Sequence, residues 1–131
     1  MGLVGAAGSG KTPLGRTILN LVRATSGTIT FDGRDVTRLP RREWRTLRSN
    51  AQMVFQDSHS SLNPRLSVID SIAFGLLAHG ATRRAAEMRS RNTLADVGLE
   101  PDRFANVFPH ELSGGQRQRV NVARALALEP R

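Results

Sequence analysis

Apolar residues in the second half of the chain recur every three or four positions, which is the spacing of an amphipathic helix. One such stretch follows Ser67, a good helix N-cap with Asp70 three residues later, and ends at Gly80. An arginine-rich stretch covers about 82–97, and a last one extends over about 113–129. The pattern therefore predicts a block of helices in this half of the chain.

The first half instead alternates between short apolar runs and glycine-containing turns. Residues 1–4 indicate the end of a buried strand, and apolar residues at helical spacing follow over 14–22. An Asp-Gly turn within 28–36 predicts a β-hairpin, and Pro40 can open a short helix. The apolar run 51–56 is typical of a buried strand. Together these elements predict an α/β core that carries the helical block as an insert.

A glycine-rich loop lies between the first predicted strand and helix. Residues 5–12 read GAAGSGKT and match the pattern G-x-x-x-x-G-K-[ST] of phosphate-binding loops. Glycines allow the backbone to approach an anion closely, and the N–H groups of the loop and helix start then point at it. Lys11 would neutralise the outer phosphates and the Thr12 hydroxyl would ligate Mg²⁺. The predicted nucleotide-binding residues are Gly5, Gly8, Ser9, Gly10, Lys11 and Thr12.

Pro13 departs from the usual composition of such loops. Proline is tolerated in the first turn of a helix, because its missing N–H would have no intrahelical partner there. If the N–H at this position normally serves a phosphate, however, the proline weakens the fit to a nucleotide.

A second glycine motif, Ser113-Gly114-Gly115-Gln116, opens the last predicted helix. Ser113 and Gln116 are spaced as a capping box, and an N-cap stabilises a helix by about 1 kcal/mol. Each glycine costs roughly 0.5–1 kcal/mol relative to alanine, so capping alone does not explain the pair. A helix start bare of side chains suits an approaching anion. Because this motif lies about a hundred residues beyond the first loop, two facing chains would explain both better than one site within a chain.

In order, these motifs resemble those of the ATP-binding-cassette (ABC) ATPases. Gly5–Thr12 is similar to the Walker A loop, Gln56 at a strand end to the Q-loop, and Leu112–Gln116 to the signature motif. The stretch 54–65 and the Pro-His-Glu before the signature look like the oligopeptide and dipeptide importer branch. The resemblance covers essentially the whole chain.

The resemblance implies that two ATPase subunits pair head to tail. Ser113, Gly114, Gly115 and Gln116 of one subunit would then bind the ATP that the phosphate loop of the other holds. Gln56 would lie near Mg²⁺ and the attacking water, as a tentative catalytic residue and metal ligand. The helical block would dock on transmembrane permease subunits. The implied organisation is an incomplete ABC domain with core 1–56, helical subdomain 57–112 and signature helix 113–131.

The family also has a strand ending in Asp-Glu and a switch histidine beyond the signature helix. The chain ends at Arg131, before that strand, so we expect it to bind nucleotide without hydrolysing it. The leading hypothesis is the ATP-binding energy subunit of an importer, for peptides by resemblance. A degenerate nucleotide-binding or interaction fragment is an alternative, and a DNA-repair ABC ATPase is a more distant one.

Composition changes this picture little. The formal net charge is +8, and it comes from eighteen arginines spread over predicted helices and one lysine, Lys11. The two groups of arginines on predicted helices, at 41–48 and 83–91, have only Trp44 among them as an aromatic residue, so we expect solvated helix faces and no nucleic-acid partner. No apolar run approaches the ~18–20 residues that span a bilayer, and there is no signal peptide or cysteine. These features fit a cytoplasmic protein, which the resemblance places peripherally on the inner face of a bacterial membrane.

Overall fold

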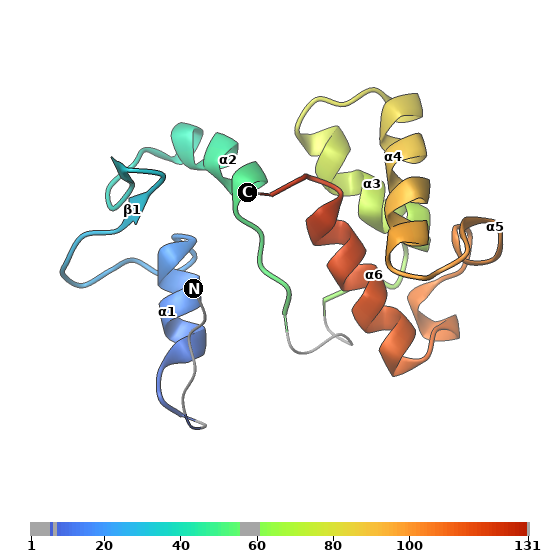
Figure 1. Cartoon of the computed structure of the whole chain (residues 1–131), viewed down its shortest axis with the longest axis horizontal. Coiled ribbons are helices and arrows are strands. Elements are labelled where there is room, and N and C mark those ends of the chain that lie inside the picture. Colours follow the sequence, from blue (N-terminus) through green and yellow to red (C-terminus); the bar gives the residue numbers. More distant parts are fainter. Residues whose placement is uncertain (1–5, 7, 56–60, 131) are drawn as a thin grey trace. The chain divides into compact units, whose positions relative to one another are not determined.

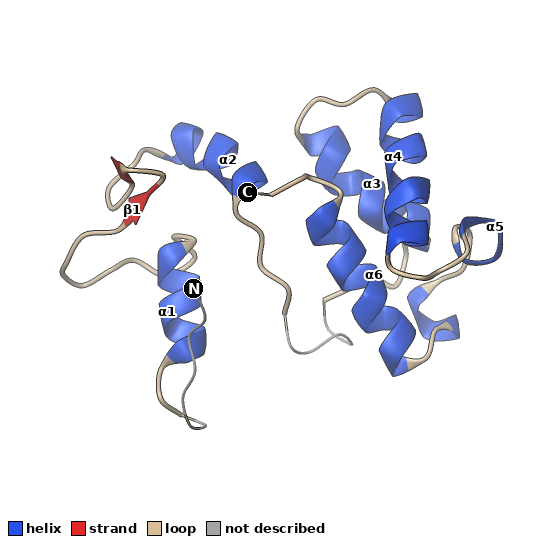
Figure 2. Cartoon of the chain, viewed as in Figure 1, coloured by secondary structure: helices blue, strands red, loops and turns tan. Residues whose placement is uncertain are grey.

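The computed structural model describes residues 6, 8–55 and 61–130 (Figure 1). They belong to two compact units, Met1–Met53 and Val54–Arg131. The first contains α1 (Lys11–Ile18), β1 (Thr30–Phe31), β2 (Arg34–Asp35) and α2 (Arg41–Asn50). The second contains α3 (Val68–Ala78), α4 (Arg83–Asp96), α5 (Pro101–Phe104), the 3-10 helix η1 (Pro109–Glu111) and α6 (Gly114–Leu126). Figure 2 shows that the two short strands lie in the first unit and that the second unit, where it is described, consists of helices and the loops that join them.

The predicted β-hairpin is confirmed, with shorter strands than expected. β1 and β2 are antiparallel, and Phe31 pairs with Arg34 across the turn. Asp32 and Gly33 have φ angles of 52° and 76°. Two consecutive left-handed residues match the twist of the flanking strands, which is why Asp-Gly is favoured in such turns.

Few apolar side chains are fully buried among the described residues of the first unit. Pro40 precedes α2 as its N-cap, as predicted, and Trp44 on that helix and Val36 after β2 are 2% and 0% exposed. The apolar face predicted over 14–22 is not buried in the structure, because Leu14 and Ile18 of α1 are 46% and 43% exposed. The helix also ends at Ile18, and its predicted stripe does not continue beyond that residue as helix.

The strand predicted over 51–56 is wrong for the part of it that the structure describes. Residues 51–55 form no strand, and Val54 and Phe55 are 39% and 42% exposed. A strand is stable only when its backbone groups hydrogen-bond to a neighbouring strand. Within the described residues the only sheet is the pair β1 and β2, so residues 51–55 have no partner there.

The second unit has one hydrophobic core, which α3, α4 and α6 share (Figure 1). The predicted helices are confirmed, and so is the Ser67 cap, whose side chain accepts a hydrogen bond from Asp70 N. Thr82, which was predicted only as the approximate start of its helix, caps α4 in the same way and accepts from Ala85 N. The core residues are Leu62, Val68, Ile72, Leu94, Leu99, Ala105, Leu112, Val120, Ala123 and Ala127.

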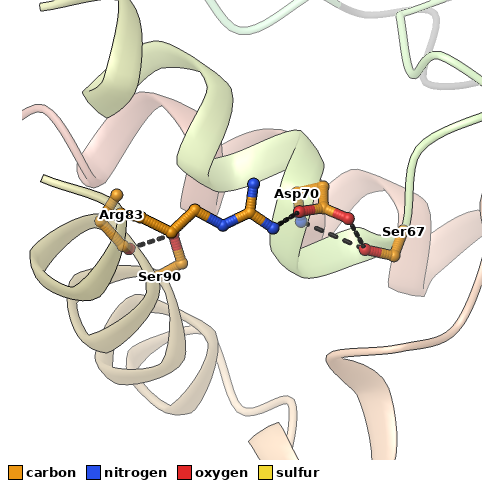
Figure 3. A network of polar contacts seen from close by, with 5 residues as sticks. Ser67, Asp70, Arg83 and Ser90 are labelled. Carbon is orange, nitrogen blue, oxygen red and sulfur yellow. Dashed lines mark hydrogen bonds and ion pairs between the residues drawn. The ribbon is translucent and has the colours of Figure 1, made fainter. Parts of the chain in front are cut away.

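Polar contacts join the start of α3 to α4 (Figure 3). The Ser67 hydroxyl donates to Asp70 Oδ2 at 2.7 Å, and Arg83 of α4 reaches Asp70 Oδ1 at 3.2 Å. On the buried face of α4, the Ser90 hydroxyl donates to Ala86 O at 2.7 Å and so satisfies itself within the helix. The exposed ion pair contributes little free energy, so the apolar core carries the stability of the unit.

No helix within residues 6, 8–55 and 61–130 is long and apolar enough to cross a membrane.

Candidate nucleotide-binding site

The phosphate loop is shaped by two glycines in left-handed conformation. Gly8 and Gly10 have φ angles of 81° and 85°, and Gly10 is the N-cap of α1. A Cβ on either residue would meet nothing within 4 Å, so the glycines are needed for their backbone angles and not for lack of space. The loop therefore delivers the chain directly into the first turn of a helix, where unpaired N–H groups favour an anion.

Lys11 folds back over this loop. Its Nζ donates to Ala6 O at 2.6 Å and to Ser9 Oγ at 3.1 Å. The ammonium thus lies above the glycine turns and is held by neutral oxygens of the loop itself. A phosphate oxygen would be a stronger acceptor for this charge than either of them. The donor set of the loop therefore fits a phosphate group.

The start of α1 also accommodates Pro13. The first helical hydrogen bond of α1 runs from Leu14 N to Gly10 O at 2.9 Å, so position 13 needs no N–H for the helix. Thr12 lies beside it in the first turn with its side chain exposed. Of the remaining predicted residues, Gly5 and Gln56 lie outside the described part of the chain.

The second motif forms the capping box that its spacing predicts. Ser113 is the N-cap of α6, its hydroxyl accepts from Gln116 N at 3.3 Å, and Gln116 Oε1 accepts from Ser113 N at 2.8 Å. Ser113, Gly114 and Gly115 are all exposed. The phosphate-binding candidate at this helix start is therefore open to a second molecule.

The two glycines of α6 are not required by the fold. Neither Gly114 nor Gly115 has a positive φ, and a Cβ on either would meet nothing within 4 Å. Alanine would fit both positions and would favour the helix. Packing within the described residues therefore does not account for these two glycines.

The sequence did not predict the role of Arg117, which hydrogen-bonds to the segment just before this helix start. Its Nη1 donates to Leu112 O at 2.7 Å and to Pro109 O at 3.2 Å. These bonds hold the segment before Ser113 against α6. The signal in the sequence was an arginine near a helix N-terminus, where the helix dipole disfavours a cation unless specific acceptors hold it.

These two helix starts, one in each unit, define a P-loop protein that carries a second glycine-opened helix start. The chain belongs to the ABC transporter family, because the sequence model of that family matches residues 1–131.

Curated relatives include importer subunits. The chain is 47% identical over 131 residues to a putative peptide import ATP-binding protein of Brucella ovis, covering 99% of this chain and 41% of the relative. It is 50% identical over 134 residues to the dipeptide transport ATP-binding protein DppF of Lactococcus lactis, covering 99% and 43%. The chain thus spans about two fifths of the length of these relatives.

Solved structures match the fold. A bacterial ABC transporter cassette described as a dimer superposes with a TM-score of 0.84 at 32% identity, covering 95% of this chain and 54% of that one. The same cassette in a dimeric post-hydrolysis state bound to ADP and Pi gives 0.83 at 34% identity, with the same coverage. These matches confirm the predicted α/β P-loop core with its helical block, of which this chain is one portion.

Proposed function

We propose that this chain is the nucleotide-binding portion of the energy subunit of an ABC importer. The observation that carries the proposal is the phosphate loop, in which Gly8 and Gly10 open the start of α1 and the Lys11 ammonium donates to Ala6 O and Ser9 Oγ of the same loop. Family membership supports ATP as the nucleotide. The relatives named for peptide and dipeptide import support peptides as the transported substrate.

The proposed site is shared between two subunits. Ser113, Gly114, Gly115 and Gln116 of one subunit complete the site that the loop of the other begins. This is supported by the exposed start of α6, its unneeded glycines and the dimeric cassettes that the fold resembles. In the whole protein, transmembrane permease subunits are the further partners, at the inner face of the membrane.

Magnesium belongs to the same proposal. The Thr12 hydroxyl and Gln56 are the residues that would hold it. Mg²⁺, when bound, neutralises part of the phosphate charge. The role of Thr12 is then to fix the ion beside the loop, while Lys11 offsets the charge on the outer phosphate oxygens.

The test is nucleotide binding by the chain and by two matched variants. Lys11→Ala should weaken binding of Mg-ATP at least about tenfold, because a charge-assisted hydrogen bond is lost. Arg16→Ala removes the same charge from the exposed side of the same helix and should leave binding within about twofold, since exposed charges interact weakly. Titration with a fluorescent ATP analogue measures both. Equal losses in the two variants, or no binding by the unchanged chain, would overturn the proposal.

A further inference from the structure

Two side chains of α6 join it to the chain segment that precedes α3. Asn121 Nδ2 donates to Ser61 Oγ at 2.7 Å, and Arg124 Nη1 donates to Ser61 O at 2.6 Å. Arg124 Nη1 also lies 3.2 Å from Asn121 Oδ1, which closes a triangle of hydrogen bonds. Sixty or more residues of sequence separate Ser61 from its two partners, so the contact is purely tertiary.

The charge in this cluster is unusual for a stabilising contact. Arg124 is half-buried, and desolvation lowers the pKa of its guanidinium. No carboxylate pairs with Arg124 within the described part of the chain, where its acceptors are a backbone carbonyl and an amide oxygen. Burying a cation against neutral acceptors is unfavourable, and an apolar residue of similar volume often stabilises as well. What the arginine secures is therefore the position of Ser61, more than the free energy of folding.

The neighbouring residues make this attachment rigid. Asn121 is 6% exposed, and Leu62, next to Ser61, is 5% exposed and belongs to the shared core. Beyond it the chain turns tightly, since Asn63 accepts from Arg65 N at 3.0 Å through its side chain and from Leu66 N at 3.2 Å through its carbonyl. The turn leads directly to the capped start of α3.

Asn121 lies eight residues after Ser113 on the same helix. At about 1.5 Å of rise per residue, roughly 12 Å of helix separate it from the start of α6. Residues 116–121 contain neither proline nor glycine, the common causes of a sharp kink, so we expect this stretch to move as one piece. Whatever moves the exposed start of α6 therefore also moves the cluster at Ser61.

We propose that Asn121 and Arg124 are positioning residues that fasten the segment before α3, Ser61–Leu66, to α6, so that this segment moves with the phosphate-facing start of the helix. The attachment itself stands on the hydrogen bonds above. Its coupling to phosphate rests on the proposed function. We call Ser61, Asn121 and Arg124 the α6 clamp.

Hydrogen exchange of the whole chain tests the attachment. Asn121→Leu keeps the branched shape of the side chain and removes its polar groups, so the amides of Arg65 and Leu66 should exchange about tenfold faster while those of α4 stay unchanged. Asn121→Asp should restore slow exchange, because its carboxylate accepts from Arg124 and from the Ser61 hydroxyl. Asn92→Leu, at an exposed position of α4, is the control and should change neither.

Two outcomes of this comparison would overturn the attachment. One is unchanged exchange at Arg65 and Leu66 in Asn121→Leu. The other is an equal acceleration in α4, which would mean general destabilisation of the unit.

Addition of Mg-ATP tests the coupling. In the unchanged chain, exchange should slow at the start of α6 and at Arg65 and Leu66 together. In Asn121→Leu it should slow at the start of α6 alone. Slowing at both places in that variant would refute the coupling. If Mg-ATP protects neither the phosphate loop nor α6 in the unchanged chain, the proposed function and the coupling both fail, while the comparison without nucleotide still decides whether the clamp holds.

Discussion

Ser113 and Gln116 hydrogen-bond to each other twice, and each uses one backbone N–H and one side-chain oxygen. The Ser113 hydroxyl serves the cap only as an acceptor, so its own hydrogen remains able to donate to an approaching oxyanion. Its side chain is also exposed. Capping the helix and binding a phosphate therefore use different capacities of the same residue, and substitutions can separate them.

Two substitutions of Ser113 should have opposite rankings for stability and for function. Ser113→Ala should lower the free energy of unfolding by about 1 kcal/mol, whereas Ser113→Asp should preserve it, because Asp caps as well as Ser. For ATP-dependent association of two chains the order reverses, since the Asp charge repels phosphate. Urea unfolding and analytical ultracentrifugation with Mg-ATP measure the two quantities. Association of Ser113→Asp at the unchanged level would contradict a phosphate role for this residue.

Alanine substitutions of Gly114 and Gly10 should have opposite effects on stability. Gly114→Ala should stabilise α6 by roughly 0.5–1 kcal/mol, because the position is helical and its surroundings are open. Gly10→Ala should destabilise the loop by about 1–2 kcal/mol, because a side chain is strained at a φ of 85°. Both should impair nucleotide binding, one in trans and one directly. A Gly114→Ala variant that is stabilised and still associates fully with ATP would remove the functional reason for this glycine.

Local chemistry explains why much of the candidate site could be predicted. The Asp-Gly turn, the Ser67 and Ser113 caps and the Gly10-Lys11 helix start each depend on residues within a few positions of one another. Short-range rules of φ angle and capping therefore suffice to place them.

The sequence did not predict features that depend on contacts outside a residue's own helix or strand. The strand predicted over 51–56 needed a partner that local patterning does not supply, and residues 51–55 form none. Leu126 is 44% exposed whereas Val120 on the same helix is buried, because six residues of a helix with 3.6 residues per turn place the two side chains on different faces. Arg117 and Arg124 act through carbonyl groups of other segments, which periodicity does not reveal.

The core of the second unit should depend on Ile72 far more than on a larger neighbour. Ile72 on α3 is 1% exposed, whereas Phe74 on the same helix is 65% exposed. Ile72→Ala should therefore lower the free energy of unfolding by about 2–5 kcal/mol, and Phe74→Ala should change it by less than about 0.5 kcal/mol. Thermal and urea unfolding compare the two. Similar losses in both would show that Phe74 is buried against another part of the protein.

The hairpin should carry a small pH dependence through Asp35. Hydrogen bonds from the Thr37 side chain and backbone lower the pKa of this carboxyl below its ordinary value of 3.8. The folded state thus favours the carboxylate, so its contribution to stability is present above pH 3.8 and is lost as the pH falls through the lowered pKa. NMR titration should show a higher pKa of Asp35 in Thr37→Val and no change in Thr25→Val. An unchanged pKa in Thr37→Val would contradict the role of the hydroxyl.

Mixing two inactive variants should restore ATP-dependent association if the site is shared between chains. Lys11→Ala spoils the phosphate loop and leaves the start of α6 intact, while Ser113→Asp does the reverse. A head-to-tail pair of the two variants contains one site with both parts sound and one with both parts spoiled. We therefore expect neither variant to associate alone with Mg-ATP, and their equimolar mixture to recover association at up to one site per pair. The double variant Lys11→Ala/Ser113→Asp, mixed with either single variant, is the control, because none of its pairs contains a site with both parts sound. If the mixture of single variants associates no better than this control, the nucleotide is not held between two chains, and the start of α6 does not bind it in trans.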